Sequence, residues 1–267
     1  MIQKLAKTEV DRRLSVALIE TDRSYFEMAA EMHDLSIGKL VWMPGLNHLA
    51  SSCVVHRIEP DDTARMGISW LDEVESALRS FEVPRSRLYF DEYPTEFATV
   101  LKERGYQHRG EIGFLAPVGA PSPPSGFRLC RVRTDDDWKL KRCLHEEAME
   151  GPDGYTNQAD HWVEMERRKC ANGSMRSYLV RHNDEIVATV GAIVTNKLLR
   201  LKNIVVAANM RRRGIGHATV QLLWQLAETQ HSCRLGVYGV EHGKGSRMYR
   251  RAGLYEVNEQ HEWSRIL

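Results

Sequence analysis

A proline-rich segment at residues 117–126 divides this chain into two parts. It holds four of the nine prolines in the 267-residue sequence. Because proline lacks a backbone N–H group and fixes φ, the segment continues neither a helix nor a central strand. About 116 residues precede it and about 141 follow it, and each part is long enough to bury its own core. We therefore predict two domains, 1–116 and 127–267, joined by a linker at 117–126.

The overall composition is that of a soluble globular protein. Hydrophobic residues make up 42% and charged residues 27%, and the mean hydropathy is -0.44, which argues against a disordered or membrane-embedded chain. No apolar run approaches the roughly 18 residues of a membrane-spanning helix. The net charge of +1 gives no basic excess for nucleic acid. We expect a monomer or homodimer that binds neither nucleic acid nor a membrane.

The cysteines and the first residues bear on the compartment. Five widely spaced cysteines without a C-x-x-C pair disfavour a disulfide framework and a zinc site. Residues 1–13 mix charges with isolated apolar residues and lack the continuous apolar stretch of a secretory leader. We therefore expect a cytoplasmic protein that needs no metal.

The C-terminal part alternates strand-like and helix-like segments. Apolar periodicity predicts helices at 134–149, 161–170, 215–230 and 246–251. The strands are predicted at 127–132, 177–181, 186–195, 198–206, 234–240 and 254–266. This order predicts a mixed α/β sandwich.

Two short segments of the N-terminal part are similar to segments of the C-terminal part. Residues 100–106 match 248–254 at an offset of 148, and residues 64–69 match 211–216 at an offset of 147. Nearly equal offsets predict an internal duplication, with chance similarity as the alternative. The N-terminal copy is predicted to be degenerate, because it carries Ala64 for Arg211, Ser69 for Gly216 and Leu101 for Tyr249.

The segment that carries chemistry follows the strand predicted at 198–206. It reads Arg-Arg-Arg-Gly-Ile-Gly-His-Ala over residues 211–218 and opens the next helix. Glycine lets a ligand approach the backbone, the N–H groups of a helix N-terminus bind anions, and arginine suits phosphate. The pattern predicts a phosphate-binding loop, and a solvated basic turn is the alternative. A Walker A sequence is absent and a G-x-G-x-x-G fingerprint is incomplete, which disfavours a dinucleotide-binding protein.

Two motifs in this part resemble one known family. The sequence Arg211-x-x-Gly214-x-Gly216 is similar to the pyrophosphate loop Q/R-x-x-G-x-G/A of the GCN5-related N-acetyltransferase (GNAT) family. Residues 248–254, Met-Tyr-Arg-Arg-Ala-Gly-Leu, are similar to the family's C-terminal L-Y-x-x-x-G-F. The resemblance covers residues 127–267 and implies two tandem GNAT-like mixed α/β domains, of which the C-terminal one is catalytic.

The resemblance also implies a co-substrate and its contacts. Acetyl-coenzyme A would lie with its pyrophosphate on the backbone of 212–218 and its pantetheine arm on 204–206, where the fourth and fifth strands splay. Tyr249 falls on the family's frequent general acid, which protonates the departing thiolate; a packing tyrosine is the alternative. The implied cofactor-binding residues are Ile204, Val205, Val206, Arg211, Arg212, Arg213, Gly214, Ile215, Gly216, His217, Ala218 and Ser246.

The chain departs from the family pattern at the base. Arg200 stands where many members have a glutamate, and residues 186–227 contain no Asp or Glu. A carboxylate base on that strand is therefore excluded. Water remains as the route for the proton, as do side chains in flanking loops, namely Glu147, Glu150, Asp153, Glu241 and His242.

The same positive strand bears on the acceptor. Arg200 and Lys202 alternate onto one strand face, which predicts an acceptor with an anionic group; a solvated strand face is the alternative. The candidate substrate-binding residues are Arg200, Lys202, Glu147, Asp153 and Tyr155. We predict an N-acetyltransferase that acts on the primary amine of a small, amino-acid-like metabolite. A different acyl donor and a non-catalytic acetyl-coenzyme A sensor are the alternatives.

Overall fold

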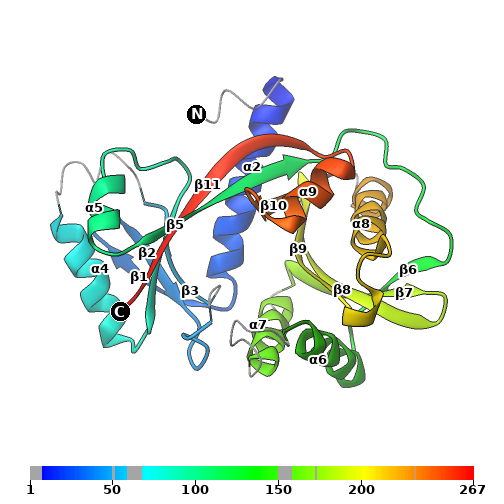
Figure 1. The fold of residues 1–267 in the computed structure, drawn as a ribbon, viewed down its shortest axis with the longest axis horizontal. Coiled ribbons are helices and arrows are strands. Elements are labelled where there is room, and N and C mark those ends of the chain that lie inside the picture. The colour runs from blue at the N-terminus through cyan, green and yellow to red at the C-terminus, as the bar shows by residue number, and fades with distance from the viewer. Residues whose placement is uncertain (1–7, 50–51, 59–67, 150–157, 172, 232) are drawn as a thin grey trace. The chain divides into compact units, whose positions relative to one another are not determined.

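A computed structural model describes residues 8–49, 52–58, 68–149, 158–171, 173–231 and 233–267 (Figure 1). The chain divides into two units, Met1–Gly113 with Val257–Leu267, and Phe114–Glu256. Both units mix helices with sheet strands, so the predicted α/β class is confirmed. None of the helices in the described ranges is both long enough and apolar enough to cross a membrane.

The first unit is a mixed sheet with helices. Its strands follow the spatial order β1-β2-β3-β4-β11-β5, with β3 and β4 parallel and β11 antiparallel to β4. A core forms where the apolar stripe of α4, including Trp70 and Leu71, meets sheet residues such as Leu88 and Phe90. The helices are α2 (Glu9–Glu27), α4 (Ser69–Ser80) and α5 (Ala98–Glu103). The strands are β1 (Glu31–Leu35), β2 (Gly38–Trp42), β3 (Cys53–His56), β4 (Arg85–Phe90), β5 (Gln107–Leu115) and β11 (Tyr255–Ile266).

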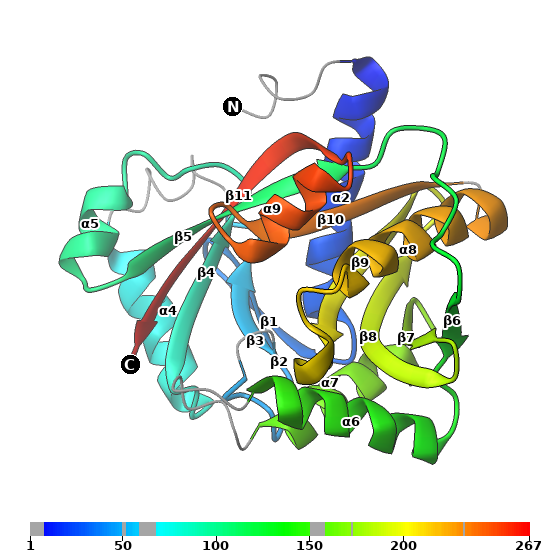
Figure 2. The ribbon, with the colours of Figure 1, turned by 45° about the vertical axis from the view of Figure 1, so that its right-hand side comes forward.

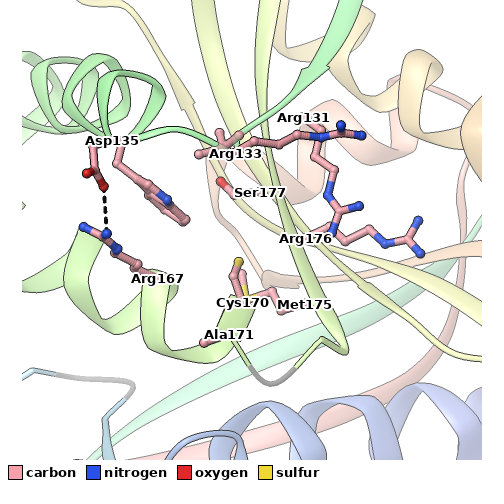
Figure 3. Close-up of a pocket in the computed structure, with 11 residues that line it drawn as sticks. Arg131, Arg133, Asp135, Arg167, Cys170, Ala171, Met175, Arg176 and Ser177 are labelled. Carbon is pink, nitrogen blue, oxygen red and sulfur yellow. Dashed lines mark hydrogen bonds and ion pairs between the residues drawn. The ribbon is translucent and has the colours of Figure 1, made fainter.

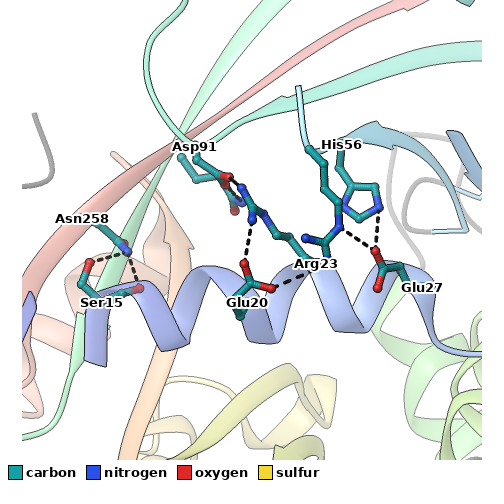
Figure 4. Close-up of polar contacts among 9 residues, drawn as sticks. Ser15, Glu20, Arg23, Glu27, His56, Asp91 and Asn258 are labelled. Carbon is teal, nitrogen blue, oxygen red and sulfur yellow. Dashed lines mark hydrogen bonds and ion pairs between the residues drawn. The ribbon is translucent and has the colours of Figure 1, made fainter. Parts of the chain in front are cut away.

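Helix α2 carries a row of polar contacts to this sheet (Figure 4). Arg23 pairs with Asp91 and with Glu20, and Arg57 lies 2.8 Å from Glu27 between Nε and Oε1. Thr8 begins the helix with a reciprocal capping box, in which its hydroxyl accepts from the backbone N–H of Asp11. These contacts fix the polar side of α2, while its apolar side is buried.

The last strand of the chain belongs to the first unit. Strand β11 pairs with β4 from His261 opposite Phe90 to Ile266 opposite Arg85. Asn258 Nδ2 also donates to Ser15 Oγ on α2 at 2.9 Å (Figure 4). The sequence pattern predicted this strand and grouped it with the C-terminal domain; the structure groups it with the N-terminal residues, because its hydrogen-bonding partner is β4.

The second unit contains the remaining strands in the order β10-β9-β8-β7-β6. Neighbouring strands are antiparallel except β9 and β10, which are parallel. The strands are β6 (Phe127–Arg131), β7 (Met175–His182), β8 (Glu185–Val194), β9 (Leu198–Val206) and β10 (Arg234–Val240). The helices are α6 (Asp135–Met149), α7 (Ala159–Ala171), the short 3-10 turn η1 (Ala208–Met210), α8 (Ile215–His231) and α9 (Lys244–Arg251).

Two helix pairs cover opposite faces of this sheet (Figures 1 and 2). A Cβ on Gly191 of β8 would lie 3.4 Å from Glu166 of α7, so this side faces α6 and α7. A Cβ on Gly239 of β10 would lie 2.6 Å from Ser246 Oγ of α9, so that side faces α8 and α9. Side chains alternate between the two faces along each strand, so each sheet residue near the site can be assigned to the α6/α7 face or to the α8/α9 face.

The predicted duplication has a structural counterpart at two helix ends. After α5, the N–H of Tyr106 donates to the carbonyl of Leu101 at 2.9 Å, past Gly105 with φ 82. After α9, the N–H of Leu254 donates to the carbonyl of Tyr249 at 3.1 Å, past Gly253 with φ 89. Both ends are therefore Schellman turns that lead into a strand. Most of the other matched segment, residues 64–67, lies outside the described residues.

Candidate active site

Strands β9 and β10 pair only at their beginnings. Their parallel register starts at Arg234 opposite Leu198 and ends at Gly236 opposite Arg200, whereas β9 runs on to Val206. The other edge of β9 keeps its antiparallel pairing with β8 up to Val206. Beyond Arg200, the edge of β9 that faces β10 therefore presents peptide groups without a strand partner. Such an edge can hydrogen-bond an extended ligand that contains amides.

A β-bulge lies where the two strands part. Thr189 lies opposite Val205 but Gly191 lies opposite Lys202, so β9 has one extra residue here. Asn203 absorbs it with a φ of 53. A bulge bends its strand and increases the local twist, and this one begins just after the last β9–β10 pair. Its position coincides with the point where the two strands stop pairing.

The loop after β9 leads into an uncapped helix. Arg212 and Gly214 both adopt left-handed backbone, with φ 64 and 79. The first intrahelical bond of α8 runs from Ala218 N to Gly214 O at 2.9 Å, so the amides of 215–217 have no acceptor within the helix. Gly214 has no side-chain oxygen to cap them. These N–H groups and the positive end of the helix dipole suit an anion.

The two glycines of the loop have different surroundings. A Cβ built on Gly214 would meet no atom within 4 Å, so the space in front of the helix is open. A Cβ built on Gly216 would lie 2.6 Å from Met248 Sδ on α9. Gly214 therefore serves the left-handed turn and leaves room for a ligand, while Gly216 allows α8 and α9 to pack closely.

The three arginines of the loop are exposed. Arg211 donates from Nε to the carbonyl of Val206 at 3.3 Å and from Nη2 to the carbonyl of Ala148 at 3.4 Å. Its guanidinium thus joins the end of β9 to the last turn of α6. Binding of a pyrophosphate by these arginines stays a prediction.

Comparison with known proteins identifies this arrangement. The profile of the acetyltransferase (GNAT) family matches residues 141–254, from α6 through the loop to the end of α9. This chain carries a GNAT acetyltransferase domain. The predicted family is therefore confirmed. No functionally curated protein matches the sequence.

Solved structures share the fold over most of the chain. A GCN5-related N-acetyltransferase from Kribbella flavida is 15% identical, with 97% of this chain and 96% of that chain covered at a TM-score of 0.63. One from Sphaerobacter thermophilus is 19% identical, with 95% and 90% covered at 0.59. A tandem GNAT protein from the clavulanic acid biosynthesis pathway is 13% identical, with 86% and 79% covered at 0.53. The predicted fold, two tandem GNAT-like mixed α/β domains, is confirmed.

Tyr249 of the GNAT domain lies beside the splayed end of β10. Its side chain is buried, and its ring centroid is 5.7 Å from that of Phe114. A Cβ on Gly239 would come within 3.1 Å of Tyr249 Cε2, so only glycine leaves room there. One turn earlier, Ser246 Oγ donates to the carbonyl of Val240 at 2.5 Å and fastens α9 to β10. The acid role of Tyr249 and the cofactor contact of Ser246 stay predictions.

The candidates for the base that the structure describes, Glu147, Glu241 and His242, are exposed. Glu147 is exposed on α6. Glu241 and His242 form an exposed pair after β10, 3.8 Å apart between carboxylate oxygen and imidazole Nε2. Glu150, Asp153 and Tyr155 lie outside the described residues. Within the described ranges, no group of three or more His, Cys, Asp or Glu is placed to hold a metal ion.

Arg200 and Lys202 do share one face of β9. They lie opposite Ile193 and Gly191, which alternate with Thr189 on the face covered by α6 and α7. Arg200 is only 1% exposed, and its guanidinium carbon is 5.1 Å from the ring centroid of Tyr238. A solvated strand face is therefore wrong for Arg200. Lys202, nearer the strand end, is half-buried.

A buried polar cluster under α6 was missed by sequence reasoning. Lys141 Nζ lies 2.7 Å from Glu166 Oε1 of α7 and donates to Thr189 Oγ1 at 2.8 Å. His145, one helical turn after Lys141, is 3% exposed. Burial, and then the charge of Lys141, lower the pKa of His145 to about 4. The signal was available, because these polar residues share an i, i+3, i+4, i+7 stripe with Leu144 and Ala148.

A pocket of about 450 Å³ lies at the other end of α6 (Figure 3). It opens between the start of α6 and the end of α7, where Asp135 and Arg167 form an ion pair of 2.7 Å. Arg131, Arg133 and Arg176 add positive charge to its lining. None of the predicted site residues lines this pocket, so it is separate from the splay and the glycine loop.

Proposed function

We propose that the GNAT domain transfers the acetyl group of acetyl-coenzyme A to the primary amine of a small, anion-bearing, amino-acid-like metabolite, by direct attack within a ternary complex. Family membership supports acetyl transfer in general. The observation that carries the acceptor class is the position of Arg200, buried at the base of the splay.

The cofactor side of the proposal rests on the fit of the loop. The open space at Gly214 and the uncapped amides of 215–217 suit the pyrophosphate. The free edge of β9, which includes 204–206, suits the amides of the pantetheine arm and the acetyl carbonyl. Tyr249, beside the same opening, would donate a proton to the departing thiolate.

The acceptor side rests on charge. Arg200 and Lys202 share the α6/α7 face of β9, with Arg200 at the last β9–β10 pair and Lys202 at the bulge. A guanidinium binds a carboxylate or phosphate through two parallel hydrogen bonds, which fixes the ligand's orientation as well as its charge. Anchoring the anion there would align the amine with the thioester, and such alignment supplies much of the rate in bimolecular transfers.

The test is a paired comparison of acceptors. Thiol release is measured with amino acids and with the amines that remain after their decarboxylation. We expect the amino acids to have the higher kcat/KM, and Arg200→Met to remove most of that preference with coenzyme A affinity unchanged. Lys197→Ala, an exposed cation on the preceding turn, is the matched control and should keep the preference. Equal use of both amine classes by the unmodified protein would refute the acceptor class.

The proposal includes the compartment and the oligomeric state of the enzyme. All five cysteines are free thiols in the structure. Free thiols suit the reducing cytoplasm, where we place the enzyme as a monomer or homodimer.

A further inference from the structure

His145 is a buried histidine on the inner side of α6. It is 3% exposed, and neither ring nitrogen has a hydrogen-bond partner among the residues that the structure describes. A buried polar group without a partner costs stability, so it calls for an explanation such as a bound water, a ligand or a catalytic role. The neighbouring Lys141 differs, because its ammonium group already forms an ion pair with Glu166 and donates a hydrogen bond to Thr189.

Contacts on both sides of His145 fix its place in the domain. One turn earlier, Lys141 donates to Thr189, which lies opposite Val205 at the end of β9. Three residues later, the carbonyl of Ala148 accepts from Arg211, which also holds the carbonyl of Val206. His145 therefore lies between a contact to Thr189 of β8, which is opposite Val205, and a contact to Arg211, which bonds Val206. Val205 and Val206 lie in the part of β9 that has lost its β10 partner.

The neighbouring packing agrees with this placement. Leu144, beside His145, belongs to a buried cluster with Ala207 and Leu179, and Met210 of η1 packs against it. The inner side of α6 thus covers the end of β9 from the α6/α7 face. Arg200 and Lys202 lie on the same face. The imidazole therefore shares that face with the cations proposed to hold the acceptor.

We infer that His145 is the proton acceptor for the attacking amine, in the place of the strand carboxylate that this chain lacks. The inference rests on the proposed function. The amine lone pair forms a bond to the thioester carbon, and the carbonyl π electrons move to oxygen. The nitrogen then gives its proton to the free lone pair of the imidazole. The carbon–sulfur bond breaks, the thiolate takes a proton from Tyr249, and amide and coenzyme A result.

The charges around His145 act on its imidazole in opposite directions. At neutral pH the imidazole is uncharged, because burial and the Lys141 ammonium oppose its protonation. The Glu166 carboxylate acts in the opposite direction and would stabilise the imidazolium once it forms.

The test combines substitution with chemical rescue in the full chain. His145→Gln keeps a polar side chain but has no basic nitrogen, and we expect its turnover of acetyl-coenzyme A with the best amine to fall about 10²- to 10⁴-fold. Coenzyme A affinity, measured by calorimetry, should change less than about twofold. His145→Ala leaves a hole for imidazole, and added imidazole should restore turnover in a saturable way.

Two controls separate catalysis from packing. Leu144→Ala disturbs the same helical turn and should show no imidazole rescue. His182→Gln removes a half-buried histidine that stacks on Phe127 of β6, and it should keep full turnover. Turnover by His145→Gln within about threefold of the unmodified protein would overturn the inference. So would a His145→Ala variant that still binds coenzyme A but whose turnover imidazole does not restore. Failure of the unmodified protein to bind coenzyme A would instead refute the proposed function, and the inference with it.

Discussion

Replacing Gly216 with alanine tests whether the second glycine of the loop serves helix packing. The new Cβ would lie 2.6 Å from Met248 Sδ, whereas ordinary contacts begin near 3.4 Å, so the thioether must move by about 1 Å. Overpacking costs about 1–3 kcal/mol, and a flexible, half-buried methionine places this site at the lower end. Alanine in a helix regains about 0.5–1 kcal/mol relative to glycine. The single change is therefore expected to alter stability by only about 0–1 kcal/mol.

The informative quantity is the coupling with Met248. Urea denaturation of Gly216→Ala, Met248→Ala and the double variant closes a cycle, and we expect a coupling of about 1–2 kcal/mol because the clash vanishes with the thioether. Gly214→Ala is the matched control. It costs about 1–2 kcal/mol through its left-handed backbone but should be additive with Met248→Ala. Additive effects at Gly216 would refute the packing role.

Three further outcomes follow from the same contacts. Tyr249→Phe should keep coenzyme A affinity in calorimetry and lose about 10²- to 10⁴-fold in kcat; near-native kcat with chemistry rate-limiting would leave the ring only a packing role. The pKa of His145 is lowered to about 4 in the folded protein, whereas a histidine in an unfolded chain has a pKa near 6.5. As the pH falls, the unfolded chain therefore takes up this proton first, and the folded protein loses up to about 3 kcal/mol of stability between about pH 6.5 and pH 4. Urea titrations at both pH values should show a smaller loss in His145→Gln, and an equal loss would contradict this. Lys141→Met strands the buried Glu166 carboxylate and should cost about 3–5 kcal/mol, most of it recovered by adding Glu166→Gln; a cost under about 1 kcal/mol would contradict a buried ion pair.

The loop could be recognised from sequence because its determinants are local. Gly214 provides the left-handed turn and leaves the helix uncapped, and both effects depend on residues within one turn. The end of the helix before Gly253 could be predicted for the same reason. Glycine and helix periodicity act over a few residues, so one sequence is sufficient to locate them.

Other features depend on partners far along the chain. The alternation in residues 254–266 predicted a strand, but nothing in it indicates that β11 pairs with β4 and not with a strand of the C-terminal domain. Likewise, a period of two placed Arg200 on one strand face without telling whether helices or solvent cover that face. His145 was not predicted, because the candidates for the base were ionisable residues in or beside loops, whereas His145 lies inside a buried helical stripe.

The central claim is that one coenzyme A binds per chain, with its pyrophosphate at the N-terminus of α8. Calorimetric titration of the unmodified protein, Gly214→Glu and Gly214→Ala tests it most directly. Gly214→Ala carries the same backbone strain as the glutamate variant but adds no charge to the open space in front of the helix. We predict one site per chain, retained in Gly214→Ala and lost in Gly214→Glu. Two sites per chain, or unchanged affinity in Gly214→Glu, would contradict the account.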